Sequence, residues 1–427
     1  MDKNRKTAYS VLMAIEIKKQ YSNIALNNHI RREKPDFPAF VRELVYGVLE
    51  NKKLLDYIIS KLITGKIKNV RTPDLVILRM GIYQIAKMSS VPEYAAVDES
   101  VQMAKKYCRG REKFINGVLR SYIRDRHSII LPDKDNDIAK YLSVRYSYEE
   151  WIVKLWLEVY DTKFVEELLK AGNETPPTTI RVNKVKAIKS DVKEKLLQAG
   201  FEVYDAELAQ SALNVKGEGL LDTDMYKNGE FSVQDEASQL VTQYLKPEPT
   251  DFIIDVCAAP GGKTLAAAEK MHNKGCILAQ DVYSRKVAGI ENEAKRLGLS
   301  NVDTFTWDAS KVREKYIGKA DKVIVDAPCS GLGVIRRKPE IKYKKNNDEM
   351  AMLPVKQMAI LEASSQYVRE GGTLVYSTCT INPYENERVV SDFVRKNPQF
   401  IIEKAVQLLP NVNKTDGFYI SVLKRKA

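Results

Sequence analysis

The chain falls into three stretches that differ in how their apolar residues recur. In residues 5–126 they repeat at helical spacing, as in FVRELVYGVLE and LLDYIIS, and no run alternates as a half-buried strand would. Pro73 suits the first turn of a helix through residues 75–88, and Pro92 marks the next boundary. The pattern predicts an all-α bundle over residues 1–130.

Helical and strand periodicities are mixed in residues 131–240. The stretch HSIILPDKDND, residues 127–137, is typical of a linker, and WIVKLWLEVY and FVEELLKAG then predict helices, the second capped by Gly172. PPTTIRVN and FEVYDAE predict strands on either side of a helix, SDVKEKLLQAG, that ends at Gly200. This order predicts a linker and a small α+β domain over residues 131–240.

Strands and helices alternate regularly in residues 241–427. The predicted strands, with one helix expected between each and the next, are FIIDVC, CILAQD, VDTFTW, KVIVDA, TLVYSTC and FYISVLK. Such alternation is typical of a doubly wound, Rossmann-like α/β sheet with helices on both faces. The chain is therefore predicted to be multidomain.

The charge of the chain is concentrated in its first third. Residues 1–130 contain 25 Lys and Arg against 13 Asp and Glu, which accounts for the whole net charge of +12. A basic module beside a neutral one favours polyanion binding, with a merely solvated basic surface as the alternative. No apolar run approaches the roughly 18 residues of a membrane span, and Glu16 interrupts the N-terminal apolar pattern. We expect a cytoplasmic protein with no membrane association.

The cysteines and histidines are few and poorly spaced for metal binding. Five cysteines, none in a CxxC pair, accompany three histidines. This composition predicts neither a disulfide framework nor a metal site.

A glycine-containing loop, CAAPGGKT, follows the first α/β strand at residues 257–264. A phosphate-binding P-loop needs a glycine where Cys257 stands, so a nucleoside-triphosphatase is disfavoured, and ATP binding would test that alternative. The dinucleotide pattern GxGxxG is also absent. The strand, tight turn and helix nevertheless predict a ligand loop at the carboxyl edge of the sheet.

Acidic residues end the next three strands: Asp281, Asp308 and Asp326. An aspartate about 20 residues beyond a glycine loop can accept hydrogen bonds from both ribose hydroxyls. The series favours a ligand with a ribose and a base but no phosphates, and S-adenosylmethionine fits, because its sulfonium cation favours acidic neighbours. Helix capping or turn formation is the alternative for each aspartate taken alone.

Two cysteines follow neighbouring strands, Cys329 in DAPCSGLG and Cys379 in STCT. Methyl transfer to C5 of a pyrimidine requires a thiolate that adds to C6, because C5 itself is barely nucleophilic. Asp326 is placed to hold the base and to stabilise charge during that addition. Two buried, unreactive thiols are the alternative, and the residues alone do not decide which cysteine attacks.

Several motifs resemble those of a known family, the RNA 5-methylcytosine methyltransferases of the Sun/Nol1/NOP2 group. They are FSVQDEASQLV, DVCAAPGGKT, DAPCSGLGVIRRKPEIKY, STCTINPYENE and DGFYISVLK. The first third of the chain is similar to the NusB-like RNA-binding helical domain, through SNIALNNHI, VRELVYGVLE, ILRMGIYQI, VPEYAAVDESVQMAKK and FINGVLR. The resemblance covers nearly the whole chain and is weakest over residues 130–225.

The resemblance implies a role for each matching position. Cys379 would be the nucleophile, and Cys329 would aid release of the methylated product. Asp281 would bind the cofactor's ribose, Asp308 its adenine, and Asp326 both cofactor and target base. The loop residues implied to line S-adenosylmethionine are Cys257, Ala258, Ala259, Pro260, Gly261, Gly262 and Lys263.

The implied reaction is methylation of one cytosine in 16S rRNA, which makes 16S rRNA the expected partner of a monomer. A tRNA substrate, or a non-catalytic ribosome-assembly factor, are the alternatives. Gln280 stands where the family usually has an apolar residue.

The segment after Cys329, IRRKPEIKYKK at residues 335–345, has six basic residues to one acidic. We expect Arg336, Arg337 and Lys338 to contact RNA phosphates close to the active site, with a solvated loop as the alternative. The target base is expected to be flipped out or already unpaired, because it must reach a buried thiol.

Overall fold

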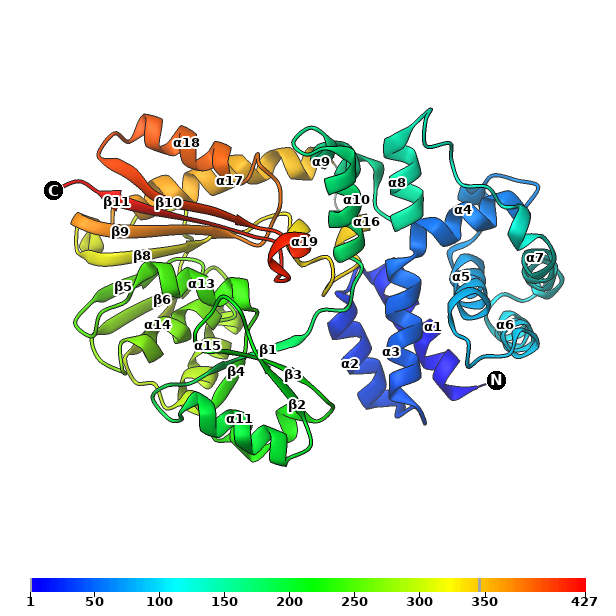
Figure 1. Cartoon of the computed structure of the whole chain (residues 1–427), viewed down its shortest axis with the longest axis horizontal. Helices are drawn as coiled ribbons and strands as arrows, with labels where there is room; N and C mark the ends of the chain where they lie inside the picture. Colours follow the sequence, from blue (N-terminus) through cyan, green and yellow to red (C-terminus); the bar gives the residue numbers. More distant parts are fainter. Residues whose placement is uncertain (1, 345–346) are drawn as a thin grey trace. The chain divides into compact units, whose positions relative to one another are not determined.

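The computed structural model describes residues 2–344 and 347–427. They form two compact units, each coloured along the chain in Figure 1. The first unit comprises Met1–Glu174 together with Ile335–Lys345, and the second comprises Thr175–Val334 and Asn346–Ala427. The predicted domain boundaries, at residues 130 and 240, are not the limits of these units and stay a prediction.

The first unit is helical throughout its described residues, as the apolar spacing predicts (Figure 1). Within residues 2–344 and 347–427, no helix has the length and apolar character needed to cross a membrane. The α-helices of this unit are α1 (Lys3–Lys18), α2 (Ser22–Glu33), α3 (Pro38–Glu50), α4 (Lys52–Leu62), α5 (Thr72–Lys87), α6 (Glu93–Tyr107), α7 (Glu112–Asp125), α8 (Ile138–Tyr146), α9 (Glu150–Leu157), α10 (Thr162–Ala171) and α16 (Ile341–Lys344).

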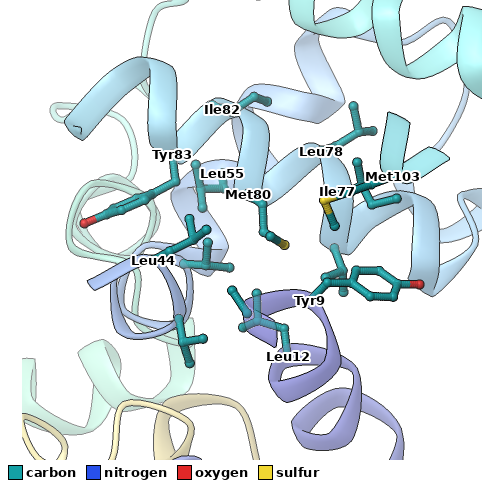
Figure 2. Close-up of a cluster of buried hydrophobic side chains, with 14 of the residues drawn as sticks. Tyr9, Leu12, Leu44, Leu55, Ile77, Leu78, Met80, Ile82, Tyr83 and Met103 are labelled. Carbon is teal, nitrogen blue, oxygen red and sulfur yellow. The ribbon is translucent and has the colours of Figure 1, made fainter. Parts of the chain in front are cut away.

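One apolar core joins α1 through α7. Figure 2 shows part of it, with side chains from α1, α3, α4 and α6 gathered around the buried helix α5. Gly47 of α3 faces the ring of Tyr83 on α5, and a Cβ there would lie 1.9 Å from that ring's Cζ. Only glycine therefore allows α3 and α5 to pack this closely.

The segment Ile335–Lys345, which we call the anchor segment, belongs to the first unit although its neighbours in sequence belong to the second. The carboxylate of Glu340 accepts a hydrogen bond from the backbone N–H of Ser22 at 2.9 Å. The hydroxyl of Tyr343 donates to the carbonyl oxygen of Ser147 at 2.8 Å. Both contacts tie the segment to helices that lie far before it in the sequence.

Lys342 of the anchor segment has no exposed surface. Its Nζ donates to the carbonyl oxygen of Glu50 at 3.2 Å and to Oδ1 of Asn173 at 2.5 Å, and it lies 4.1 Å from the ring centroid of Tyr148. Burial lowers the pKa of Lys342 to about 7 and raises the pKa of the Glu50 carboxyl to about 7. The lysine is thus held by polar contacts that come from the first unit.

Lys342→Ala should destabilise the first unit by about 2–4 kcal/mol, because it opens a cavity beside Tyr148 and removes two buried hydrogen bonds. The measurement is urea unfolding of the full chain, followed by the fluorescence of Trp151 and Trp156. Lys338→Ala, in the half-exposed part of the anchor segment, should change the midpoint little. Equal midpoints for the two variants would contradict the anchoring role of Lys342.

The second unit begins with a small antiparallel sheet in the order β2-β3-β1-β4. Its strands are β1 (Thr178–Val182), β2 (Glu202–Asp205), β3 (Ala212–Lys216) and β4 (Phe231–Val233), and its helices are α11 (Lys189–Gln198) and α12 (Asp224–Lys227). The predicted small α+β fold agrees with this sheet and its helices, whereas α8, α9 and α10, which fall in the predicted range 131–240, belong to the first unit. The short strands β3 and β4 were not predicted.

A seven-stranded sheet forms the rest of the unit in the order β10-β11-β9-β8-β5-β6-β7. Strands β5 through β9 are parallel, and β10 and β11 are antiparallel additions. The strands are β5 (Phe252–Asp255), β6 (Cys276–Asp281), β7 (Val302–Thr306), β8 (Ala320–Asp326), β9 (Val368–Thr378), β10 (Phe400–Leu408) and β11 (Phe418–Arg425).

Helices cover both faces of this sheet, which confirms the predicted Rossmann-like fold class. Alternate residues of the strands enter two separate apolar clusters, so that Ile253 packs on one face and Ile254 on the other. The first face is covered by α13 (Glu236–Leu245), α14 (Gly262–Lys270) and α15 (Ser284–Leu297), and the second by α17 (Asn347–Ser365) and α18 (Glu387–Lys396). The short α19 (Pro410–Asn413) precedes β11.

Two elements differ from the predicted alternation. The helix expected between β7 and β8 is only a 3-10 turn, Glu314–Tyr316, although Val312 and Tyr316 of this connection pack against the core. Strand β10 was not predicted, since a register shift between Ile402 and Lys404 interrupts its alternation and most of its residues are exposed. Neither difference moves the carboxyl edge of the parallel strands.

Candidate active site

The two cysteines predicted to share a sheet edge are neighbours in the structure. Strands β8 and β9 are paired in parallel up to Asp326 and Ser377, so the loops that follow them begin side by side. The sulfur of Cys329 lies 3.3 Å from the sulfur of Cys379, within hydrogen-bond distance. Two thiols at this separation can share one proton and titrate as a coupled pair.

The pKa of the Cys329 thiol is raised well above its usual value. Its hydrogen bond to Cys379 is the largest cause, followed by burial and by the negative charges of Glu385 and Asp326. Cys329 therefore keeps its proton at neutral pH. Either thiol can be the donor in the Cys329–Cys379 hydrogen bond.

Asp326, at the end of β8, has both carboxylate oxygens engaged. Lys263 donates from Nζ to Oδ2 at 2.6 Å, and the hydroxyl of Ser377 donates to Oδ1 at 2.8 Å. The same ammonium lies 5.0 Å from the ring centroid of Phe418. Lys263, which the loop's resemblance to a P-loop would assign to phosphate, instead pairs with a carboxylate beside the two thiols.

The glycine loop connects β5 to α14, as predicted. Gly261 has φ of +106°, a conformation that favours glycine, and α14 begins at Gly262. The backbone N–H of Ala258 donates to the carbonyl oxygen of Gln280 at 2.8 Å, which ties the loop to β6. Burial raises the pKa of the Cys257 thiol, so this cysteine stays neutral and unreactive.

Asp255, which the sequence did not single out, lies at the end of β5 directly before the loop. Its side chain is fully buried and accepts a hydrogen bond from the Thr264 hydroxyl at 2.6 Å. Burial raises the pKa of Asp255 to about 7. The sequence does hold a signal for this residue, since an aspartate inside the apolar run FIIDV is expected to be buried and to need a polar partner.

The other two strand-end aspartates differ in their surroundings. Asp281, at the end of β6, is buried and accepts from the backbone N–H of Tyr283 at 3.1 Å. Asp308, after β7, lies at an exposed turn, and hydrogen bonds from the Ser310 hydroxyl and N–H lower its pKa. Asp308 thus also performs the turn-forming role that was its alternative interpretation.

Arg181, on β1 of the small sheet, stabilises the glycine loop through contacts with α14. No pattern in the sequence singles it out. Its guanidinium binds both carboxylate oxygens of Glu269 on α14, at 2.8 and 2.7 Å, and both side chains are nearly fully buried. It also donates to the carbonyl oxygen of Gly262 at 2.9 Å and to Gln234. The small sheet therefore fixes the start of α14 and with it the loop.

The three residues predicted to contact RNA lie in the anchor segment, and their contact with RNA stays a prediction. Arg336, Arg337 and Lys338 belong to the anchor segment and so to the first unit, whereas both cysteines belong to the second. All three side chains are half-buried, and Lys338 lies 5.4 Å from the ring centroid of Tyr21 on the same unit. Over residues 2–344 and 347–427, no group of three His, Cys, Asp or Glu side chains could hold a metal ion.

A parallel sheet with a glycine loop, strand-end carboxylates and two adjacent thiols defines a Rossmann-like methyltransferase. Comparison with known protein families supports the same class of protein. Residues 242–424 match the model described as 16S rRNA methyltransferase RsmB/F, residues 2–124 match the NusB family, and residues 148–221 match a ferredoxin-like domain of RsmF/B-like methyltransferases. The chain belongs to the RsmB/F family of methyltransferases, which confirms the family resemblance noted from its motifs.

Relatives match over nearly the full length. A Bacillus subtilis protein named probable ribosomal RNA small subunit methyltransferase B is 36% identical, covering 99% of this chain and 98% of its own. A Vibrio cholerae protein named ribosomal RNA small subunit methyltransferase B is 32% identical, covering 92% and 91%.

Solved structures share the fold. The protein PH0851 has a TM-score of 0.84 at 24% identity and covers 98% of both chains. A methyltransferase homolog protein from Pyrococcus horikoshii has a TM-score of 0.60 at 26% identity, covering 66% of this chain and 97% of its own.

Arg181→Ala should lower the free energy of unfolding of the second unit by about 3–5 kcal/mol, because Glu269 is left buried without its counter-charge. Urea unfolding followed by the fluorescence of Trp307 would measure it. The double variant Arg181→Met with Glu269→Leu should recover much of the loss. Arg285→Ala, at an exposed position of α15, is the control. A single variant as stable as this control would contradict the supporting role of Arg181.

Proposed function

We propose that this chain transfers a methyl group from S-adenosylmethionine to C5 of a cytosine in 16S rRNA, through a covalent bond between Cys379 and C6 of the base. The observation that carries the proposal is the 3.3 Å approach of the Cys329 and Cys379 sulfurs beside the Asp326–Lys263 pair. Transfer to oxygen or nitrogen needs no thiol, whereas transfer to C5 of a pyrimidine does.

The division of roles follows the family resemblance, in which the position of Cys379 carries the attacking thiolate and the position of Cys329 aids release. The two sulfurs lie within hydrogen-bond distance, so a proton can be shared between them. Addition of the Cys379 thiolate to C6 makes C5 nucleophilic, and C5 then takes the methyl group, leaving S-adenosylhomocysteine. The C5 proton passes to a base, and the Cys379 thiolate is expelled from C6. Cys329, once it has given up its own proton, is the adjacent group that can take the proton from C5.

Asp326 and Lys263 are suited to hold the base. A carboxylate can accept hydrogen bonds from the exocyclic amine and from a protonated N3, where negative charge would otherwise build up during addition to C6. Lys263, 2.6 Å from Asp326, sets a positive charge beside that carboxylate and adds a donor at the same place.

The residues of the loop fit S-adenosylmethionine. The turn at Gly261 lets the backbone approach a ligand closely, and the buried carboxylate of Asp281 stands at the end of the next strand, where a ribose is held in sheets of this kind. The cofactor supplies an electrophilic methyl group on a sulfonium cation. We assign its binding to Cys257 through Lys263, with Asp281 at the ribose and Asp308 at the adenine.

The RNA is proposed to bind mainly to the basic first unit. The whole net charge of the chain lies in residues 1–130, and Arg336, Arg337 and Lys338 of the anchor segment add to the same unit. The two relatives named above are named as enzymes of the ribosomal small subunit. Their names favour 16S rRNA over tRNA as the polyanion that this unit binds.

A covalent-trap gel tests the chemistry. Wild type, Cys329→Ala and Cys379→Ala are each incubated with unmodified small-subunit rRNA and S-adenosylmethionine and run under denaturing conditions. Cys329→Ala should accumulate a protein–RNA adduct, because the bond to C6 forms but is not released, whereas Cys379→Ala should form none. The reverse pattern would exchange the two roles. No adduct and no 5-methylcytidine with rRNA, but product with tRNA, would move the substrate to tRNA.

Replacing Arg336, Arg337 and Lys338 by glutamine should weaken RNA binding. The slope of log K against log salt should become shallower by about 0.7–0.9 for each phosphate that the variant no longer neutralises. Turnover at saturating RNA should not change, since none of these three residues is assigned a role in the chemistry. Lys193, Lys195 and Lys216, replaced by glutamine together, remove the same charge from the small sheet and serve as the control. An unchanged salt slope in the first variant would remove these three residues from the RNA interface.

A further inference from the structure

Each of the two proposed catalytic cysteines is held through the residues on either side of it. Cys379 stands between Thr378 and Thr380, and Asn386 binds both. Its Oδ1 accepts from the Thr378 hydroxyl at 2.6 Å, and its Nδ2 donates to the carbonyl oxygen of Thr380 at 3.1 Å. Asn386 thereby fixes the backbone that carries the Cys379 thiol.

Glu385, the residue before Asn386, does the same for Cys329. Its Oε2 accepts from the backbone N–H of Ser330 at 2.8 Å and from Nε2 of Gln357 at 2.9 Å. The same Gln357 amide donates to the carbonyl oxygen of Pro328 at 3.0 Å. Both neighbours of Cys329 are thus held by the Glu385 carboxylate. Ser330 binds it directly, and Pro328 is linked to it through Gln357 of α17.

These hydrogen-bonded side chains are buried, and they cannot move without losing hydrogen bonds. Glu385 and Asn386 have no exposed surface. The second oxygen of Glu385 accepts from Nδ2 of Asn382 at 2.9 Å, so the carboxylate meets three N–H groups. The hydroxyls of Ser330 and Thr380, each directly after a cysteine, lie 2.5 Å apart. A buried carboxylate with this many donors is costly to move, because displacement leaves several polar groups unpaired.

We infer that Glu385 and Asn386 are positioning residues that set the separation of the Cys329 and Cys379 thiols, Glu385 acting on the release step and Asn386 on the attack step. Because the two are consecutive, a peptide bond fixes the distance between the two anchoring points. Glu385 holds the loop of the thiol proposed to assist release, and Asn386 holds the loop of the proposed nucleophile. The inference rests on the proposed function.

The experiment separates these two steps in the full-length chain. Formation of the protein–RNA adduct and release of 5-methylcytidine are timed in single turnovers with small-subunit rRNA and S-adenosylmethionine. Glu385→Ala should slow release by about 10- to 100-fold while the adduct still forms, because a displacement of about 1 Å costs that much in rate. Asn386→Ala should instead slow formation of the adduct. The KM for S-adenosylmethionine should not change in either variant.

Two further substitutions distinguish positioning from general loss of structure. Glu385→Gln keeps an oxygen for Ser330 and Gln357 and should restore release to within about threefold of wild type. Gln357→Leu removes the bonds to Pro328 and to Glu385 but leaves the bond between Glu385 and the Ser330 N–H. It should slow release without slowing attack, which keeps the inference testable if Glu385→Ala does not fold. Glu387→Ala, at an exposed position two residues farther on, is the control and should leave both rates unchanged.

Two results would overturn the inference alone. The first is release at the wild-type rate by an active Glu385→Ala or Gln357→Leu variant. The second is a parallel loss of attack, release and cofactor binding in Glu385→Ala and Asn386→Ala, without rescue by Glu385→Gln. If wild type makes no 5-methylcytidine and Cys329→Ala traps no adduct, the proposed function fails, and this inference fails with it.

Discussion

The parallel pairing of β8 with β9 is the constraint on which the site depends. Parallel neighbours end at the same edge of a sheet, so Asp326 and Ser377 stand side by side and the two cysteine loops begin together. Antiparallel pairing would have sent the second loop to the opposite edge. The buried apolar clusters on the two faces hold this register, because a slip by one residue would move every side chain to the wrong face.

The electrostatics of the site follow from the balance of charges at this edge. Asp255, Asp281 and Asp326 lie at the ends of neighbouring strands, and Lys263 is engaged by one of them. A P-loop concentrates N–H groups and a lysine on an anion, whereas this edge concentrates carboxylates. The same strand–loop–helix geometry is thereby suited to a cation, such as a sulfonium, and poorly suited to a triphosphate. The raised pKa of Asp255 limits the negative charge that gathers here.

The sequence was informative where function depends on local motifs and strand order. The glycine loop, the strand-end aspartates and the two cysteines could be placed on one edge of the sheet, because strand ends and short loops leave clear patterns.

The sequence contains no signal for a residue that acts through a distant partner. Arg181 sits in an ordinary strand pattern, and nothing near it in sequence reveals Glu269, 88 residues away. The anchor segment shows the same limit, because its basic residues predicted RNA contacts, with a solvated loop as the alternative. Only the tertiary structure reveals that Glu340 and Lys342 are buried. The short strands β3 and β4 were also missed.

The anchor segment also has a consequence for how the protein is made. A ribosome delivers the helices of the first unit early, but the residues that occupy the sites beside Ser22, Ser147 and Asn173 emerge only after the glycine loop and strands β5 through β8. Until then the N-terminal bundle lacks one of its parts, although domains usually complete themselves in order from the N-terminus. Maturation of the helical unit is therefore coupled to synthesis of the catalytic one. A nascent chain that stops short of the anchor segment has neither unit complete.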